Sequence, residues 1–342
     1  TVNPFTESGQ TGVYTATITS EQPAELTLSV AVSGVSLNQA LTITFLPGVA
    51  ESIEIVSGNN QSASVASELP EPIVVKVTDL FGNPVEGESV TFAFDETPSA
   101  AVGRSIDPET ATTDVNGEAS AVVSLGIIPG VYTIEAVSQN AGSVTFRAQG
   151  TIGQASNISI TTQPSNTVAG APISPSPSVE ITDNEGNGIE GVTVNATLTD
   201  GDFSAGSVLE STTNASGEAI FDDLRIEAAE SGYTITFETE VSALATVTSN
   251  PFSILAADPD PANSSGSVPN GSPGDLTEIE ITVEDEFGNR VEGVSSAIAL
   301  SVTQGANAGA AFEPVSDEGN GLYATGYTPS ATGTDNISID IN

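Results

Sequence analysis

Short runs in which apolar and polar residues alternate recur along the whole chain. The clearest pair places apolar residues at every second position: Ile73, Val75 and Val77, then Val90, Phe92 and Phe94. Alternation with period two is typical of half-buried β-strands. Stretches rich in Gly, Pro, Ser and Asn separate the runs, as turns do. We therefore predict an all-β chain with no long helix.

One turn motif joins such runs in three places. It reads Asp, two residues, Gly-Asn, one residue, Val or Ile, then Glu-Gly, and its copies begin at Asp79, Asp183 and Asp285, at steps of 104 and 102 residues. Gly and Asn tolerate the positive φ that tight turns need, so the motif predicts a hairpin between the two flanking strands. A period near a hundred residues, with several strands in each copy, predicts tandem β-sandwiches.

A second turn motif follows each copy of the first by some thirty residues. It begins at Asp114, at Asn214 and at Glu318, and a strand follows it each time. In two repeats a Tyr then opens a late strand, Tyr132 and Tyr233. This placement predicts a tyrosine corner, in which the hydroxyl bonds to the backbone a few residues upstream.

The chain resembles the bacterial immunoglobulin-like domains found in tandem in invasin- and intimin-type adhesins and in other large surface proteins. The residues that carry the resemblance are Val77, Asp79, Gly82, Asn83, Val85, Gly87, Val90 and Phe92, then Thr113, Asp114, Gly117 and Ala119, then Gly130, Tyr132, Thr133 and Ala136. It covers nearly the whole chain. It implies immunoglobulin-like β-sandwiches with Greek-key topology, outside the cell, that mostly act as spacers. The receptor contact of invasin-type proteins lies in a terminal lectin-like domain that is not recognisable here, so their adhesive residues are not carried over.

The turn-rich stretches predict four segments. Residues 1–48 are the C-terminal half of an immunoglobulin-like domain, residues 49–150 and 151–255 are complete domains, and residues 256–342 are a domain that lacks its last strand. The linkers are short and Pro259 and Pro261 stiffen the last one, so we expect the domains to stack end to end as a rod. The unfinished ends are expected to be covered by continuation of the polypeptide or, alternatively, by strands from neighbouring copies in a fibre.

Charge excludes one class of partner. Five Lys and Arg stand against 45 Asp and Glu, a formal net charge of −40, which repels nucleic acid and anionic lipid. Either a high-salt habitat or a secreted repeat protein kept soluble by self-repulsion accounts for this surface. No apolar run approaches the ~20 residues of a membrane span, so we expect no membrane insertion in this segment.

Catalytic chemistry finds little support. The chain has neither Cys nor His, so thiol and imidazole nucleophile systems are absent, and its only lysine, Lys76, falls on the polar face of a strand. The same position argues against an isopeptide cross-link between Lys76 and an Asn or Asp. Paired carboxylates occur, but nothing marks a pocket that would perturb their pKa values. We expect no enzyme activity and no organic cofactor.

Calcium is the one ligand that the acidic residues suggest. Oxygen ligands gather at the last linker, in Asp258, Asp260 and Asn263, and at the first turn motif, in Asp79, Asn83 and Glu86. Calcium prefers such ligands and could stiffen the junctions, although no stretch has the spacing of an EF-hand loop. The alternative is that these residues form turns and supply solubilising charge.

These observations favour a structural role: a stalk or fibre segment of a bacterial surface protein or adhesin. Its expected partners are neighbouring repeats of the same chain or neighbouring copies in a fibre. The alternative is a binding module whose exposed loops recognise a host or cell-surface glycan or protein, with Tyr327 as an exposed aromatic candidate. Aromatic residues make up 5% of the chain, too few for an obvious sugar platform.

Overall fold

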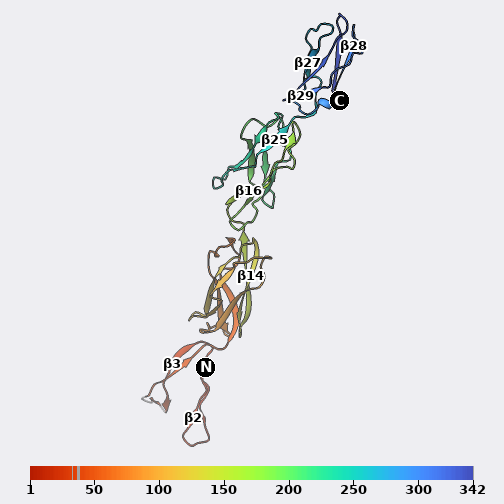
Figure 1. The fold of residues 1–342 in the computed structure, drawn as a ribbon. Coiled ribbons are helices and arrows are strands. Elements are labelled where there is room, and N and C mark those ends of the chain that lie inside the picture. Colours follow the sequence, from red (N-terminus) through yellow and green to blue (C-terminus); the bar gives the residue numbers. More distant parts are fainter. Residues whose placement is uncertain (33, 37–38, 342) are drawn as a thin grey trace. The chain divides into compact units, whose positions relative to one another are not determined.

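The computed structural model describes residues 1–32, 34–36 and 39–341 (Figure 1). They form β-strands joined by turns, with one 3-10 turn, η1 (Ser295–Ala297), and no α-helix. This confirms the all-β prediction. The chain divides into two compact units, Thr1–Gly153 and Gln154–Asn342. Three hydrophobic cores lie within them, one in the first unit and two in the second.

The first repeat is a complete sandwich. One sheet has the order β11-β13-β9-β7 and the other the order β12-β10-β14-β15-β8. The last pairing, β15 with β8, is parallel, and the other pairings are antiparallel. This is the Greek-key arrangement of immunoglobulin-like domains. The strands are β7 (Ala50–Ser57), β8 (Gln61–Ser64), β9 (Ile73–Asp79), β10 (Ser89–Phe94), β11 (Ser105–Asp107), β12 (Thr110–Thr112), β13 (Glu118–Ser124), β14 (Gly130–Ser138) and β15 (Gly142–Thr151).

The second repeat has the same order of elements in shorter strands. Its sheets are β16-β18-β21, β20-β19-β23-β24 and β17-β25-β22. The parallel pair β17–β25 corresponds to β8–β15. The strands are β16 (Asn157–Thr162), β17 (Thr167–Val168), β18 (Ser178–Thr182), β19 (Thr193–Leu198), β20 (Glu210–Thr212), β21 (Glu218–Ile220), β22 (Ser231–Tyr233), β23 (Ile235–Thr239), β24 (Val247–Thr248) and β25 (Phe252–Leu255).

The third repeat and the N-terminal segment have fewer strands. In the third repeat the sheets are β26-β27-β30-β29 and β28-β31. Its strands are β26 (Ser265–Ser267), β27 (Thr277–Thr282), β28 (Ile298–Gln304), β29 (Ser316–Gly319), β30 (Leu322–Tyr327) and β31 (Asn336–Ile341). The described residues of the N-terminal segment, residues 1–48, form three strand pairs: β1 (Thr6–Glu7) with β2 (Tyr14–Thr15), β3 (Ala24–Leu28) with β6 (Leu41–Phe45), and β4 (Ala31–Val32) with β5 (Val35–Ser36).

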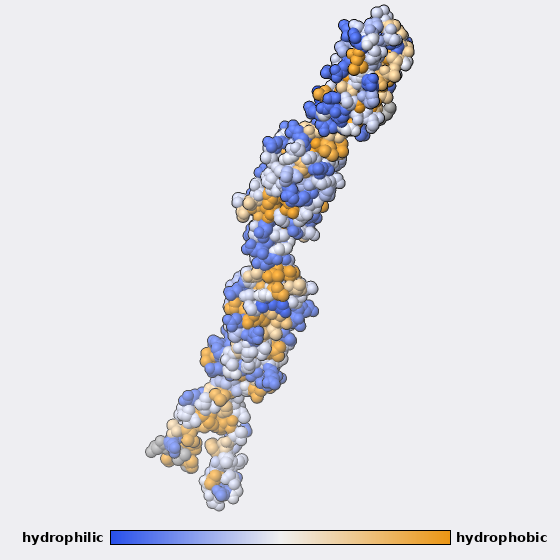
Figure 2. Space-filling model, viewed as in Figure 1, coloured by the Kyte–Doolittle hydropathy of each residue, from blue (hydrophilic) through white to orange (hydrophobic). Residues whose placement is uncertain are grey.

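The cores follow from the alternation in the sequence. Along β9 every second residue is buried, and Ile73, Val75 and Val77 are fully buried, while Lys76 lies on the opposite face. Burying each such side chain stabilises the fold by about 1.5–3 kcal/mol. The visible face of the molecule is mostly hydrophilic with separate hydrophobic patches, as expected for self-contained cores (Figure 2).

Both predicted tyrosine corners are present. The Tyr132 hydroxyl donates to the carbonyl oxygen of Ile128 at 2.6 Å, and the Tyr233 hydroxyl donates to that of Ala228 at 3.2 Å. Each ring is buried, and burial raises the pKa of each hydroxyl. Each bond holds the loop that precedes the late strand against the tyrosine ring.

The predicted hairpin at the first turn motif is wrong. Strands β9 and β10 flank the turn, but β9 pairs with β7 and β13 whereas β10 pairs with β12 and β14. The chain makes a tight local turn, in which Val85 N–H donates back to the Val77 carbonyl oxygen at 3.0 Å, and then crosses to the other sheet. Alternation identifies both strands but carries no information on which strand each one pairs with. The crossing leaves the turn at one end of the sandwich.

Candidate functional site

The first turn motif forms a closed polar unit in all three repeats. In the first repeat one oxygen of Asp79, Oδ1, accepts hydrogen bonds from the N–H groups of Phe81 and Asn83, both at 2.9 Å. The Asn83 amide nitrogen, Nδ2, donates to both carboxylate oxygens, at 3.1 and 3.0 Å. Gly82 adopts φ +79° between them, which explains the Gly of the motif. The middle repeat forms the same bonds between Asp183 and Asn187.

The Asp79 turn also binds groups outside its own sandwich. The other carboxylate oxygen, Oδ2, accepts the N–H of Gly48, in the linker before β7, at 2.8 Å. Asn83 Nδ2 donates to the carbonyl oxygen of Glu21, between β2 and β3 of the N-terminal segment, at 2.7 Å. We call this pair of side chains with its outside bonds the Asp–Asn clamp, and the place where it acts the first junction.

The same clamp recurs at the second junction, between the second and third repeats. Asp285 Oδ2 accepts the N–H of Ala257, in the linker, at 2.9 Å. Asn289 Nδ2 donates to the Glu227 carbonyl oxygen at 2.7 Å, and the separation in sequence, 62 residues, equals that of Asn83 and Glu21. Here the Asn289 Oδ1 also accepts the N–H of Ala229 at 2.8 Å. Each junction is thus held by the same two side chains acting on backbone groups.

The charged carboxylate is well stabilised at both junctions. Hydrogen bonds from the Asn83 side chain and from the N–H groups of Gly48, Asn83 and Phe81 outweigh burial and lower the pKa of Asp79 to about 2. At Asp285 burial opposes ionisation most strongly, but the side chain of Asn289 and the N–H groups of Ala257, Asn289 and Phe287 still lower the pKa. Both clamps therefore hold an ionised Asp at neutral pH.

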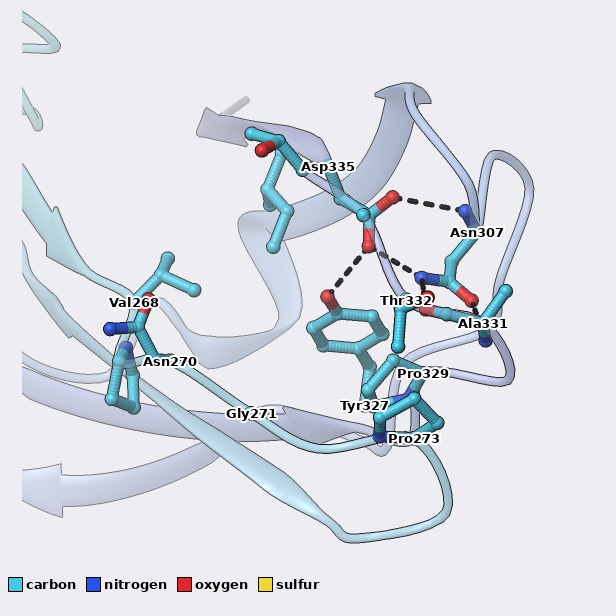
Figure 3. A pocket seen from close by; sticks show the side chains of 14 residues that line it. Val268, Asn270, Gly271, Pro273, Asn307, Tyr327, Pro329, Ala331, Thr332 and Asp335 are labelled. Carbon is cyan, nitrogen blue, oxygen red and sulfur yellow. Dashed lines mark hydrogen bonds between the residues drawn. The ribbon is translucent and has the colours of Figure 1, made fainter.

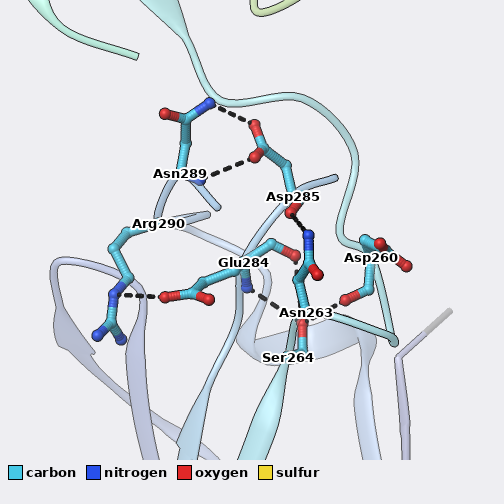
Figure 4. A network of polar contacts seen from close by, with 7 residues as sticks. All are labelled: Asp260, Asn263, Ser264, Glu284, Asp285, Asn289 and Arg290. Atoms are coloured by element: carbon cyan, nitrogen blue, oxygen red, sulfur yellow. Dashed lines mark hydrogen bonds and ion pairs between the residues drawn. The ribbon is translucent and has the colours of Figure 1, made fainter. Parts of the chain in front are cut away.

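Further hydrogen bonds and an ion pair lie beside the Asp285 clamp (Figure 4). The Asn263 side chain donates to the Asp285 carbonyl oxygen at 2.8 Å. The Ser264 hydroxyl donates to the Asp260 carbonyl oxygen at 2.8 Å and accepts the Glu284 N–H at 3.1 Å. Arg290 Nε lies 3.2 Å from a carboxylate oxygen of Glu284, on the surface. These contacts fix the linker that follows the second repeat against the turn of the third.

The structure brings together only some of the predicted calcium ligands. Asp79 and Asn83 are in contact and buried, but Glu86 is exposed and outside the clamp. At the last linker Asp260 Oδ1 accepts the N–H of Ala262 at 3.0 Å, and Asn263 binds the clamp, while Asp258 is exposed. Within the described part of the chain no three Asp or Glu side chains form a cluster suited to a metal ion. Calcium at these residues stays a prediction.

Tyr327 was predicted to be exposed, and this is wrong. Its ring is 7% exposed and stacks on Phe312 with 5.3 Å between ring centroids. Its hydroxyl donates to Asp335 at 3.1 Å (Figure 3). Tyr327 is the last residue of β30, in which every residue after Leu322 is buried, and its hydroxyl bonds to the carboxylate of Asp335.

Tyr327 borders a crevice of about 360 Å³ in the third repeat, formed by the loops around residues 268–273 and 329–335 (Figure 3). Asp335 closes it on one side and is fully engaged: it accepts the backbone N–H of Asn307 at 2.9 Å, the Asn307 side chain at 2.7 Å and the Tyr327 hydroxyl. Hydrogen bonds from Asn307 lower the pKa of Asp335. Asn307, Tyr327 and Asp335 therefore hold two loops together. No sequence pattern predicted this contact.

No family model matches the chain. It is 26% identical over 274 residues to the inverse autotransporter adhesin YeeJ of Escherichia coli K12, a match that covers 75% of this chain and 11% of that protein. Among solved structures, the Escherichia coli adhesin FdeC superposes with a TM-score of 0.54 and 21% identity, covering 87% of this chain and 95% of that one. The bacterial integrin-binding protein invasin is a weaker match, with a TM-score of 0.42 and 17% identity over 85% of this chain and 56% of that one.

None of these proteins is described as an enzyme, and no helix in the described ranges is long and apolar enough to cross a membrane. The superposition on FdeC supports the β-sandwich fold of this chain. The chain consists of tandem immunoglobulin-like β-sandwiches, similar in sequence to part of the bacterial adhesin YeeJ and in fold to the bacterial adhesin FdeC.

Proposed function

We propose that the chain is a stalk segment of a bacterial surface adhesin, in which Asp–Asn clamps hold neighbouring repeats in a fixed orientation. One observation carries the proposal. At both described junctions the same Asp and Asn reach out of their own sandwich, to a linker N–H and to a carbonyl oxygen of the preceding segment. A module that works alone has no use for these outward bonds, whereas a stalk needs its junctions stiff.

The two outward hydrogen bonds of each clamp stabilise the junction effectively because the turn already holds both side chains in the bonding geometry. The Asp carboxylate is held by N–H groups of its own turn, and the Asn amide is held by that carboxylate, so neither side chain loses much freedom when the junction forms. Hydrogen bonds to a charged acceptor contribute about 1.5–3 kcal/mol each. The junction thereby resists bending without a disulfide, which a chain lacking Cys cannot form.

Electron-paramagnetic-resonance distance measurement tests the proposal. Because the chain has no cysteine, spin labels attach only at introduced ones, and Glu210→Cys in β20 with Ser301→Cys in β28 places them on exposed positions of the second and third repeats. We expect a narrow distance distribution that Asn289→Ala broadens. Asn116→Ala is the matched control, since Asn116 bonds only within its own exposed turn. A broad distribution in the parent chain would refute the stalk proposal.

The alternative, a binding module, has its best place at the crevice of the third repeat. Asp335 is occupied there, so contacts to a ligand would fall to polar lining residues such as Asn270, Thr332 and Thr334. Screening the whole chain on a glycan array decides this. Binding that Thr332→Ala and Asn270→Ala remove would favour a binding role, whereas no binding leaves the stalk role.

A further inference from the structure

The turn motif carries a third residue that reaches out of its sandwich. Phe287, two positions after Asp285, is half-buried and packs against the hydrophobic core of the second repeat. Its N–H is held by Asp285 Oδ1 at 2.9 Å, so the clamp sets the direction of the ring. The junction thus has an apolar contact beside the polar clamp, and that contact crosses from the third repeat to the second.

Gly170 receives this ring. A Cβ built on Gly170 would lie 2.7 Å from Cε2 of Phe287 and closer still to Cζ, well inside the distance that real Cβ atoms keep. The backbone at Gly170 is fixed on both sides: its N–H donates to the Ile226 carbonyl oxygen at 2.9 Å, and its carbonyl oxygen accepts Nη1 of Arg225 at 3.0 Å. Arg225 is in turn paired with Asp223 at 2.8 Å. A held backbone without a side chain forms a socket for the ring.

The φ angle alone does not explain this glycine. Gly170 has φ +74°, a region that favours Gly, but the first repeat has Ala66 at the corresponding place with φ +56°. The correspondence is fixed by equivalent bonds, since Ala66 N–H donates to Gly126 and Gly170 N–H donates to Ile226. A side chain is therefore compatible with the backbone of this turn. What Gly170 adds is the space that Phe287 fills.

The sequence varies in step with this contact. The second repeat has Gly170, and the turn motif of the repeat that follows it has Phe287 as its third residue. The first repeat has Ala66, and the turn motif of the repeat that follows it has Glu185 at that position. We infer that Gly170 is a socket that makes the second repeat selective for a following repeat with Phe at the third position of its turn motif. The inference deepens the proposed stalk function and rests on it.

Native-state hydrogen exchange in the full chain tests this pairing. The amides of Ala229 and Ala257 cross the second junction, to Asn289 and Asp285, so their protection reports how often the junction opens. We expect Gly170→Ala and Phe287→Ala each to lower that protection by about tenfold, and the double variant to lower it no further, because either change empties the same contact. Ala66→Gly is the control and should leave both amides unchanged.

The double variant also separates crowding from backbone strain. If Gly170→Ala acted only through its φ, its effect would persist in full beside Phe287→Ala and the two effects would multiply. Multiplying effects, or unchanged protection in Gly170→Ala, would overturn the inference. Either result leaves the clamp test with Asn289→Ala untouched, so failure of the socket and failure of the stalk proposal are distinguishable.

Discussion

The two described junctions share their polar bonds and differ in their apolar contact. Asp79 and Asn83 bind Gly48 and Glu21, as Asp285 and Asn289 bind Ala257 and Glu227. Yet Phe81, the counterpart of Phe287, is 53% exposed. Among the described residues of the N-terminal segment none corresponds to β17 or to the Gly170 turn.

The difference separates what is general in a junction from what is specific. The clamp binds backbone N–H and C=O groups, which every sequence offers, so it can join any two repeats with the right turn geometry. The Phe ring needs a particular small residue opposite. A chain of similar repeats thereby combines a clamp that is the same at each described junction with an apolar contact that depends on the preceding repeat.

Removing the clamp carboxylate should have the largest effect. Asp285→Ala leaves the N–H groups of Phe287, Asn289 and Ala257 without their charged acceptor, and buried donors left unpaired cost about 1–3 kcal/mol each. We expect the melting temperature of the third repeat to fall by more than about 10 °C in calorimetry. Glu286→Ala, an exposed acid of the same turn, is the control. Equal melting of the two variants would contradict the role of the clamp.

Replacing each of the two Phe residues by Ala should have different effects on stability at the two junctions. Phe287→Ala removes a ring packed on the second repeat and should lower the melting temperature of that part of the chain by about 4–8 °C. Phe81→Ala removes an exposed ring and should change stability by less than about 0.5 kcal/mol. Calorimetry of the two single variants measures both. Similar losses of melting temperature in the two variants would mean that Phe81 is packed in solution and that the junctions do not differ in this contact.

Acid should weaken the first junction in a defined window. The folded pKa of Asp79 is about 2, below its ordinary value of 3.8, so its ionised form stabilises the fold fully above about pH 4. That contribution is lost as the pH falls from about 4 to 2. Thermal melts across this range should show the loss, and Asp79→Asn should remove that part of the dependence. Glu86→Gln, which keeps the clamp, should retain it; a loss in both variants would point to general acid effects.

Salt and calcium should act differently on the acidic surface. Screening a net charge of −40 predicts that sodium chloride raises the melting temperature. Calcium at matched ionic strength tests the predicted ligands Asp258, Asp260 and Asn263. A further rise that chelator and Asp260→Asn both abolish would place calcium at the last linker. Equal melting with sodium and calcium would leave the acids as turn formers and solubilising charge.

The smallest effect is expected from the surface ion pair beside the second clamp. Arg290 and Glu284 pair at 3.2 Å with side chains 40% and 25% exposed, and such pairs contribute about 0–1 kcal/mol. Arg290→Ala should therefore leave protection of the Ala257 amide within about threefold of the parent. A loss of amide protection as large as that in Asp285→Ala would mean that the ion pair, and not the clamp, holds the junction.

Much of the fold could be predicted from local patterns. Alternation placed β9 and β10, and Gly82 with Asn83 marked a turn, because strand periodicity and positive φ are properties of a few neighbouring residues. Pairing is not local, and so the hairpin was wrong. The same limit explains Tyr327: its hydroxyl reaches Asp335, and nothing near it in sequence signals a loop that folds back over it.

The junctions were harder to predict than the repeats. Asp79 and Asn83 stood out as a motif, but their partners are backbone groups of Gly48 and Glu21, which have no sequence signature. One signal of the second junction is present in the sequence. Gly170 against Ala66, and Phe287 against Glu185, differ together between repeats, and comparing neighbouring repeats position by position would have suggested a contact.

The central claim is that the Asp–Asn clamp fixes the orientation of neighbouring repeats. Residual dipolar couplings of backbone amides in the full chain test it most directly, because they report the orientation of each repeat in solution. The account predicts that couplings from the second and third repeats fit one common alignment tensor, and that Asn289→Ala splits them into two. Separate tensors in the parent chain, or a common tensor that survives Asn289→Ala, Asp285→Ala and Phe287→Ala alike, would contradict it.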